Sequence, residues 1–186
     1  DSVTPLPDSA GPAAQGAGMA PATEPNQANA TIGCEIGGVI NFNEASGTLQ
    51  AGNFTPDLQM PGIPPTDGVA NGYAAEFLTY VELPAGLITM GVSSDDGFRT
   101  TVGFDAVGSS FLGEFDGGRG ATDTIFNFFI QEAGVYPMRT IYDEGGGDSN
   151  IEWFSVTNGV TKVFLNSTAA VAFKAYRDAV VPVNRY

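Results

Sequence analysis

The clearest structural pattern in the chain lies in residues 126–156, FNFFIQEAGVYPMRTIYDEGGGDSNIEWFSV. Phe126, Phe128 and Ile130 alternate with other residues in its first part. Met138 and Tyr142 do the same after the turn, together with Tyr136 and Thr140. Alternation with a period of two is typical of strands that bury one face. We therefore expect successive β-strands here, interrupted by an acidic, glycine-rich connection before the strand that holds Trp153.

Similar patterns continue toward both ends of the chain. Residues 76–86, EFLTYVELPAG, place Phe77, Thr79, Val81 and Leu83 on one face. Further strands are expected at 35–42, 87–94, 98–104 and 160–165, long loops over 43–72, and a short helix in TAAVAFKAYRDA, 168–179. The turn residues Asp95–Gly97 between two of these strands predict a β-hairpin. Many short strands with almost no helix predict an all-β, antiparallel β-sandwich or jelly roll.

The first 33 residues differ in composition from the rest. They are dense in Ala, Pro and Gly and contain no aromatic or basic residue. Such a segment buries too little apolar surface to fold alone. We expect two parts: an extended arm over 1–33, which lies on its own domain or, as we favour, on a neighbouring copy, and the sandwich over 34–186.

The charge balance excludes some partners. The chain has 7 Lys and Arg against 21 Asp and Glu, a formal net charge of −14. This charge repels nucleic acid and anionic lipid, and no apolar stretch is long enough to span a bilayer. The chain begins at Asp1 without a Met, from which we expect a mature product of a secreted precursor. We therefore expect an extracellular or cell-surface protein that binds neither nucleic acid nor the membrane interior.

Residue counts limit the chemistry further. The chain has no His and a single cysteine, Cys34, so it lacks a Ser/His/Asp arrangement, a disulfide framework and a Cys-rich zinc site. We expect Cys34 to be buried or, as the alternative, to pair between molecules. Acceptor sequences for N-glycosylation occur at Asn29, Asn53 and Asn166.

Two acidic, glycine-rich turns carry the candidate site. SSDDG, 93–97, and YDEGGGDSN, 142–150, each follow an expected strand and together offer Asp95, Asp96 and three further acidic residues, Asp143, Glu144 and Asp148. Calcium takes about 6–8 oxygen ligands from carboxylates, carbonyls and water, and softer metals prefer His or Cys. The alternative is that both segments are ordinary turns without a metal.

Aromatic residues near these turns are candidates for contact with a sugar. Tyr73 and Phe98 lie nearest the two loops, and the acidic Asp143 is a further candidate for contact with a ligand. Trp153, the only Trp, alternates with Ile151 on a strand, so we expect it in the core.

These same motifs resemble the protective-antigen-type domain, a module of bacterial toxins, glycosidase insertions, bacterial adhesins and yeast flocculins. The resemblance is carried by YVELPAGLITMGVSSDDGFRTTVG, 80–103, together with 126–156, and covers about residues 74–165. It implies a β-sandwich in which a cis Asp95–Asp96 peptide holds calcium beside a sugar. It also implies a second ligand loop at 144–148, with Glu144, Gly146 and Asp148 at the metal.

The chain departs from the sugar-binding members of that family in one loop. Those members carry an Asn where this chain has Glu144, and their loop is bulkier than Gly145–Gly147. The resemblance therefore supports a calcium site more directly than sugar recognition.

Two functions follow as hypotheses. The first is a non-catalytic subunit that assembles with its own copies through the arm into an extracellular filament or surface layer, with calcium as a structural ion. The second is a calcium-dependent glycan-binding module of an adhesin or carbohydrate-active enzyme, with cell-surface glycans as partners. A third class, glycoside hydrolysis by paired carboxylates, is disfavoured because Asp95 and Asp96 are typical of a turn or metal site.

Overall fold

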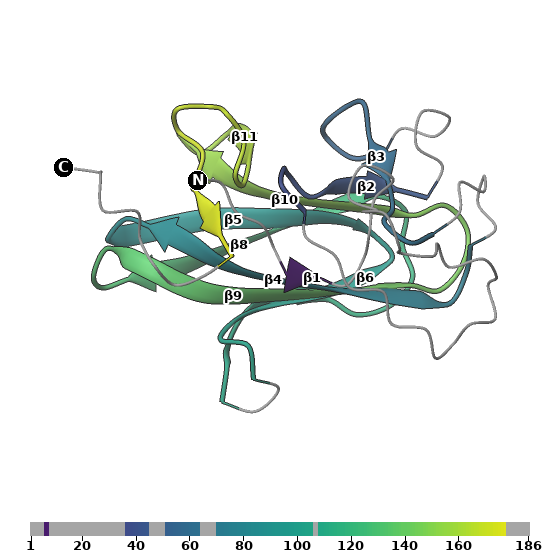
Figure 1. The fold of residues 1–186 in the computed structure, drawn as a ribbon, viewed down its shortest axis with the longest axis horizontal. Helices are drawn as coiled ribbons and strands as arrows, with labels where there is room; N and C mark the ends of the chain where they lie inside the picture. Colours follow the sequence, from purple (N-terminus) through teal and green to yellow (C-terminus); the bar gives the residue numbers. More distant parts are fainter. Residues whose placement is uncertain (1–5, 8–35, 45–50, 64–69, 106–107, 178–186) are drawn as a thin grey trace.

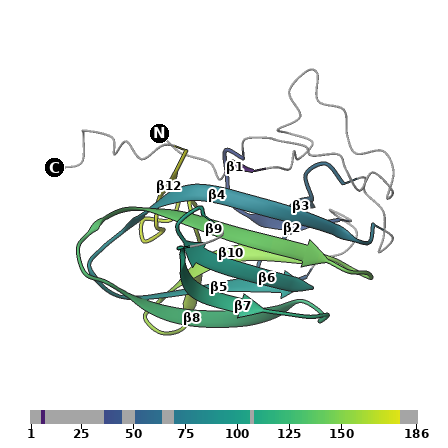
Figure 2. The same ribbon diagram turned by 90° about the horizontal axis from the view of Figure 1, so that it is seen from below.

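The computed structural model of the chain describes residues 6–7, 36–44, 51–63, 70–105 and 108–177. Two six-stranded β-sheets pack face to face (Figures 1 and 2). The described residues contain no helix, and hence none that is long and apolar enough to cross a membrane. Every strand pairing is antiparallel except that of β2 with β3. The all-β antiparallel sandwich predicted from the sequence is confirmed.

The first sheet has the strand order β1, β4, β9, β6, β7, and β12 also pairs with β4. The long strands β4 and β9 form its centre and pair over their whole lengths. The strands of this sheet are β1 (Leu6–Pro7), β4 (Tyr73–Leu83), β6 (Gly97–Val102), β7 (Ser110–Phe115), β9 (Gly134–Glu144) and β12 (Ala175–Tyr176).

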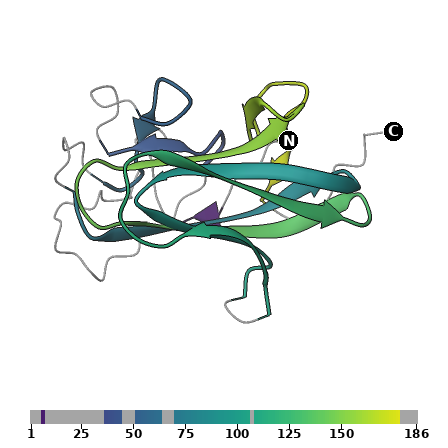
Figure 3. The same cartoon turned by 180° about the vertical axis from the view of Figure 1, so that it is seen from behind.

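The second sheet has the order β3, β2, β10, β5, β8, with β11 also paired to β10. Seen from behind, the two sheets again form two stacked layers (Figure 3). The strands of this sheet are β2 (Asn41–Asn43), β3 (Leu58–Gln59), β5 (Gly86–Asp95), β8 (Thr122–Ile130), β10 (Asn150–Thr157) and β11 (Thr161–Phe164).

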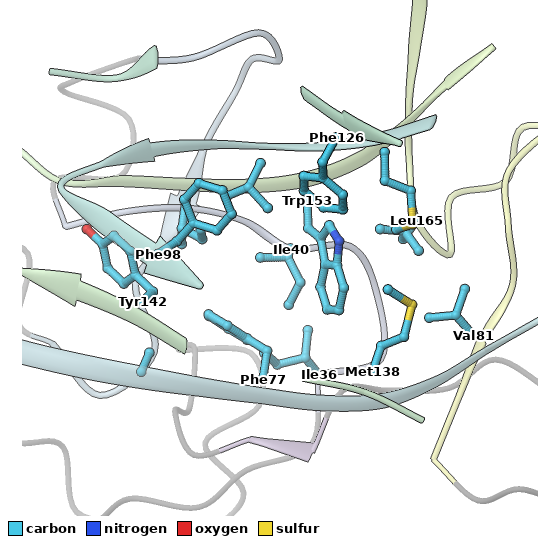
Figure 4. Close-up of a cluster of buried hydrophobic side chains, with 14 of the residues drawn as sticks. Ile36, Ile40, Phe77, Val81, Phe98, Phe126, Met138, Tyr142, Trp153 and Leu165 are labelled. Atoms are coloured by element: carbon cyan, nitrogen blue, oxygen red, sulfur yellow. The ribbon is translucent and has the colours of Figure 1, made fainter. Parts of the chain in front are cut away.

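Alternating side chains of both sheets fill the space between them. Phe77, Val81 and Met138 of the first sheet are fully buried, as Trp153 of the second is at 1% exposure. Figure 4 shows Trp153 between the two layers and Tyr142 at one end of the cluster, with its hydroxyl pointing away from the other core side chains. The expected core position of Trp153 is therefore confirmed.

The predicted hairpin at Asp95–Gly97 is wrong. β5 belongs to the second sheet, where it pairs with β8 and β10, whereas β6 belongs to the first sheet, where it pairs with β9 and β7. The turn therefore carries the chain across the core from one sheet to the other. Neither strand pairs with the other, and the turn residues alone did not reveal which strands each would join.

Two further strand and helix predictions need correction. No helix forms in the described part of 168–179; Ala175 and Tyr176 instead pair with β4 and are buried, so burial against a sheet edge outweighs helix propensity. In the expected first strand over 35–42, strand structure begins only at Asn41, after the Gly37–Gly38 pair. Ile40 is nevertheless buried in the core.

Little of the arm is described. Leu6–Pro7 form β1, which pairs with β4 of the same chain opposite Phe77 and Leu78. Cys34 and Asn29 lie outside the described residues. Asn53 is exposed, and its amide nitrogen donates hydrogen bonds to Asp123 and Glu152; its glycosylation stays a prediction.

Candidate metal centre

Three carboxylates meet at one end of the sandwich. Asp95 ends β5 in the second sheet, Asp96 follows it in the crossing turn, and Glu144 ends β9 in the first sheet. One carboxylate oxygen from each lies within 4.8 Å of the others. The peptide bond between Asp95 and Asp96 is cis. The two sheets thus each contribute ligand atoms to one point, because β5 and β9 end at the same end of the sandwich.

The carboxylate of Asp96 is fixed between two loops. Its Oδ1 accepts the backbone N–H of Arg119 at 2.7 Å, and its Oδ2 accepts that of Gly145 at 2.9 Å. Asp96 is 8% exposed. Each oxygen keeps a lone pair that can face a cation.

Glu144 is the most buried of the three carboxylates, at 1% exposure. Its Oε2 lies 3.2 Å from the hydroxyl of Tyr142, which also donates to the backbone carbonyl of Asp95. Its Oε1 is buried and has no hydrogen-bond partner among the described residues. Burial raises the pKa of Glu144 to about 8, and the neighbouring Asp96 and Asp95 carboxylates add to the rise.

Three acidic side chains lie close together in the cluster, and the charge of Arg119 offsets part of the repulsion at Asp95. Burial raises the pKa of Asp95 to about 6, with further contributions from Asp96 and Asp148. Within the described part of the chain, no salt bridge involves Asp95, Asp96 or Glu144. Carboxylates this close repel one another unless a proton or a cation lies between them.

The arrangement fits a calcium ion. Calcium–oxygen distances of about 2.3–2.6 Å place opposite ligand oxygens up to about 5 Å apart, which accommodates the observed 4.8 Å. An ion at this point would also give the unpaired Oε1 of Glu144 a partner. The donor set consists of carboxylate oxygens, which a hard cation prefers.

The other predicted ligands lie on the same loop. Gly145 contacts Asp96 through its N–H, and Gly147 donates its N–H to Asn71 at 3.0 Å, so the loop that contains Gly146 is tied to the site and to its surroundings. Asp148 is exposed and close enough to raise the pKa of Asp95. The assignment of Gly146 and Asp148 as metal ligands stays a prediction.

The three residues predicted to contact a ligand occupy different environments. Asp143 is exposed and lies opposite Gly97 in the pairing of β6 with β9. Tyr73 lies opposite Glu144 and is half-buried, with its ring edge-on to that of Tyr142 at 6.0 Å between centroids. Phe98 is 3% exposed and belongs to the core (Figure 4). Among these three, Asp143 alone presents its side chain freely to solvent.

The sequence reasoning missed Arg119. This residue lies in the 116–121 connection and donates its backbone N–H to Asp96. Its signal was present in the sequence, because Arg119 is the only basic residue between Arg99 and Arg139 and lies within the glycine-rich stretch GGRG. The bonding of Ser94 to Asp96 was also missed, because it depends on the crossing between sheets.

The chain matches known proteins in structure but not in sequence. No family model and no curated protein sequence matches this chain. A PA14 sugar-binding domain from an RTX adhesin superposes with a TM-score of 0.56 at 17% identity, over 94% of this chain and 99% of that one. The Epithelial Adhesin 6 A domain from Candida glabrata, in complex with Galβ1-3GlcNAc, gives a TM-score of 0.53 at 14% identity, over 97% and 90%.

Two further solved structures are matched over part of their length. An anti-sigma factor domain-containing protein gives a TM-score of 0.60 at 16% identity over 97% of this chain, which spans 50% of that protein. The chain also spans 57% of the PA14 domain of the MpAFP antifreeze protein. Identities this low establish the fold rather than the activity. The chain therefore has the PA14-type β-sandwich fold, as its two sequence motifs predicted.

Proposed function

We propose that this chain is a non-catalytic, calcium-dependent glycan-binding module that works outside the cell or at its surface. The observation that carries the proposal is the convergence of Asp95, Asp96 and Glu144, with a buried and unpaired Oε1 on Glu144. A buried carboxylate that has no salt bridge and leaves one oxygen without a hydrogen bond is costly, and a bound cation offsets that cost.

Calcium is the ion that the donor set supports best. The three carboxylates would supply three or more oxygens, and Gly146 and Asp148 would add ligands from the neighbouring loop. The remaining positions would be filled by water, since calcium takes about 6–8 ligands. When bound, the ion would neutralise the mutual repulsion of the carboxylates and link the end of β5 to the end of β9.

A sugar would bind at the open side of this ion. The glycines at 117–118 and 145–147 are exposed, and these five positions contribute no side chain that could cover the site. Two hydroxyl groups of a sugar can replace water on a calcium ion, because both are neutral oxygen ligands. The comparisons support this proposal in part, since the matched adhesin domains are described as sugar-binding or were solved with a disaccharide.

Hydrolysis fits the geometry less well than binding. A general acid must reach the substrate, but Glu144 is 1% exposed. Asp96 accepts one backbone N–H on each oxygen, so both of its oxygens are held in place. These contacts support a binding role.

The proposal is tested by calcium titration and glycan binding. Chelator-stripped protein should bind calcium in a calorimeter and bind glycans on an array only when calcium is present. Asp96→Asn should weaken calcium binding by about tenfold or more, because it removes a charged ligand. Glu132→Gln is the matched control, since this exposed residue lies between β8 and β9 at the opposite end of the sandwich.

Two results would count against the proposal. Equal calcium affinity in the Asp96→Asn and Glu132→Gln variants would contradict the metal assignment. If the chain binds calcium but shows no glycan binding that a chelator abolishes, the ion has a structural role and the proposed glycan recognition is wrong.

Assembly through the arm is a second candidate function. It is supported by β1, in which Leu6–Pro7 add a strand to the edge of β4. Strand addition of this kind can also join two copies when the arm of one chain occupies the edge of another. Removal of residues 1–33 should then convert an assembled protein into a folded monomer in size-exclusion chromatography. Polymers that persist after the removal would contradict this role.

A further inference from the structure

Arg119 contacts both sides of the Asp95–Asp96 peptide, although its side chain offers no ligand to a cation. Its backbone N–H donates to Asp96 Oδ1 at 2.7 Å. Its side chain extends to β5, where Nη2 donates to Ser94 Oγ at 2.7 Å and Nε donates to the Ser94 carbonyl at 3.1 Å. The Ser94 hydroxyl in turn donates to the backbone carbonyl of Asp96 at 2.6 Å. Arg119 therefore contacts Asp96 directly through its backbone N–H and indirectly through the Ser94 hydroxyl.

The surroundings of the guanidinium fix its orientation. The guanidinium carbon lies 4.1 Å from the ring centroid of Phe115 and 5.7 Å from that of Phe98. On the side of the second sheet, Nη1 donates to Thr124 Oγ1 at 2.9 Å. A planar, charged group with aromatic neighbours and three different hydrogen bonds has little freedom to move. Arg119 thus connects the crossing turn to residues of both sheets.

We propose that Arg119 is a positioning residue that sets the cation affinity of the site by holding Asp95 and Asp96 in place. The inference rests on the proposed metal site and extends it to a residue that would not contact the ion. Partners of metal ligands of this kind typically contribute about 10- to 100-fold to metal affinity.

The charge of Arg119 acts in the opposite direction from its positioning role. A guanidinium whose positive charge acts on the Asp95 carboxylate repels an incoming cation, so its removal would strengthen cation binding if charge alone mattered. If positioning dominates, removal weakens binding despite the loss of that repulsion. The two effects therefore differ in sign.

Two substitutions separate these effects. Arg119→Lys keeps the charge but loses the planar set of donors, and Arg119→Gln loses both. We expect both variants to bind calcium about 10- to 100-fold more weakly than the unmodified chain. Terbium bound in place of calcium should also retain more water molecules in both variants, as measured by luminescence lifetimes in light and heavy water.

The control is Arg99→Gln. Arg99 also lies near a phenylalanine, with its guanidinium carbon 5.6 Å from the Phe111 centroid, and it pairs with Glu114 of the neighbouring strand rather than with a residue of the site. This variant should bind calcium and terbium like the unmodified chain. Circular dichroism of each variant without metal shows whether the sandwich is intact.

The outcomes are distinguishable. An Arg119→Lys variant with unchanged affinity, together with tighter binding by Arg119→Gln, would overturn the positioning role and leave only a charge effect. Loss of affinity in the Arg99→Gln control to the same degree would also overturn it, because the effect would not be local. Failure of the unmodified chain to bind calcium or terbium would instead refute the proposed metal site itself.

Discussion

Replacement of Glu144 by Gln tests the buried charge directly. The pKa of Glu144 is raised from its ordinary 4.5 to about 8, chiefly by burial. A raised carboxyl pKa means that the folded state holds a proton that the unfolded state releases. In the absence of a cation, stability is therefore greatest below about pH 4.5 and is lost as the pH rises toward about 8.

The magnitude follows from the difference between the two pKa values. About pH 7.5 lies about three pH units above the ordinary pKa. Over this interval the carboxyl is ionised in the unfolded state but keeps its proton in the folded state, and each pH unit corresponds to about 1.36 kcal/mol of free energy. This gives about 4 kcal/mol as an upper value, and relaxation around the charge reduces it to about 2–4 kcal/mol. Gln keeps the shape of the side chain and cannot ionise. Glu144→Gln should therefore stabilise the cation-free chain by about 2–4 kcal/mol at this pH.

Urea unfolding with chelator measures this difference. Trp153 is the only Trp and is 1% exposed, so its fluorescence reports unfolding of the core. Calcium at about 100 times its Kd should add about 2.7 kcal/mol to the unmodified chain and much less to the variant. Glu132→Gln should leave stability unchanged under both conditions.

Two results would contradict an unfavourable buried carboxylate at Glu144. If Glu144→Gln is less stable than the unmodified chain in chelator at about pH 7.5, the carboxylate is not an unfavourable buried charge. A free energy of unfolding that is constant between about pH 5 and 8 without metal would lead to the same conclusion.

Three further predictions concern selectivity and packing. Asp116, Asp143 and Asp148 are exposed around the site, so sialylated glycans should bind at least about tenfold more weakly than neutral ones on an array, and equal binding would contradict this. Trp153→Ala should cost about 3–5 kcal/mol of unfolding free energy, measured by circular dichroism in urea, because it empties the middle of the core; a loss below about 1 kcal/mol would contradict the packing. Gly113→Ala should cost about 1–3 kcal/mol, since the added Cβ would lie 2.4 Å from the buried ring of Phe126; an unchanged urea midpoint would show that the two sheet edges are less closely packed.

Local patterns predicted the strands well because one face of each strand is buried. Phe77, Val81 and Leu83 alternate with more exposed neighbours on β4, and all three are buried as expected. Helix propensity was misleading at Ala175 and Tyr176, where an available sheet edge determines the structure. The hairpin at Asp95–Gly97 failed for a different reason, because a tight turn does not specify which strands it will join.

The acidic members of the site could be predicted, whereas their support could not. Asp95, Asp96 and Glu144 stand out as residue types, and the family resemblance linked the two loops. Arg119 contacts Asp96 only because the 116–121 connection and the end of β5 come together in space. Such contacts depend on topology and leave no regular spacing in the sequence.

The location of the site at a crossing between sheets links its chemistry to the fold. Asp95 lies opposite Asn150 in the second sheet, whereas Gly97, only two residues later, lies opposite Asp143 in the first. The chain thus changes sheets within the carboxylate cluster itself. A cation held there would link the two sheets at the turn that connects β5 to β6. Ion binding should therefore reduce hydrogen exchange at the ends of β5 and β9 more than at β11, which belongs to the second sheet alone. Equal protection at all three strands would show that the ion stabilises the chain globally rather than joining the sheets at this end.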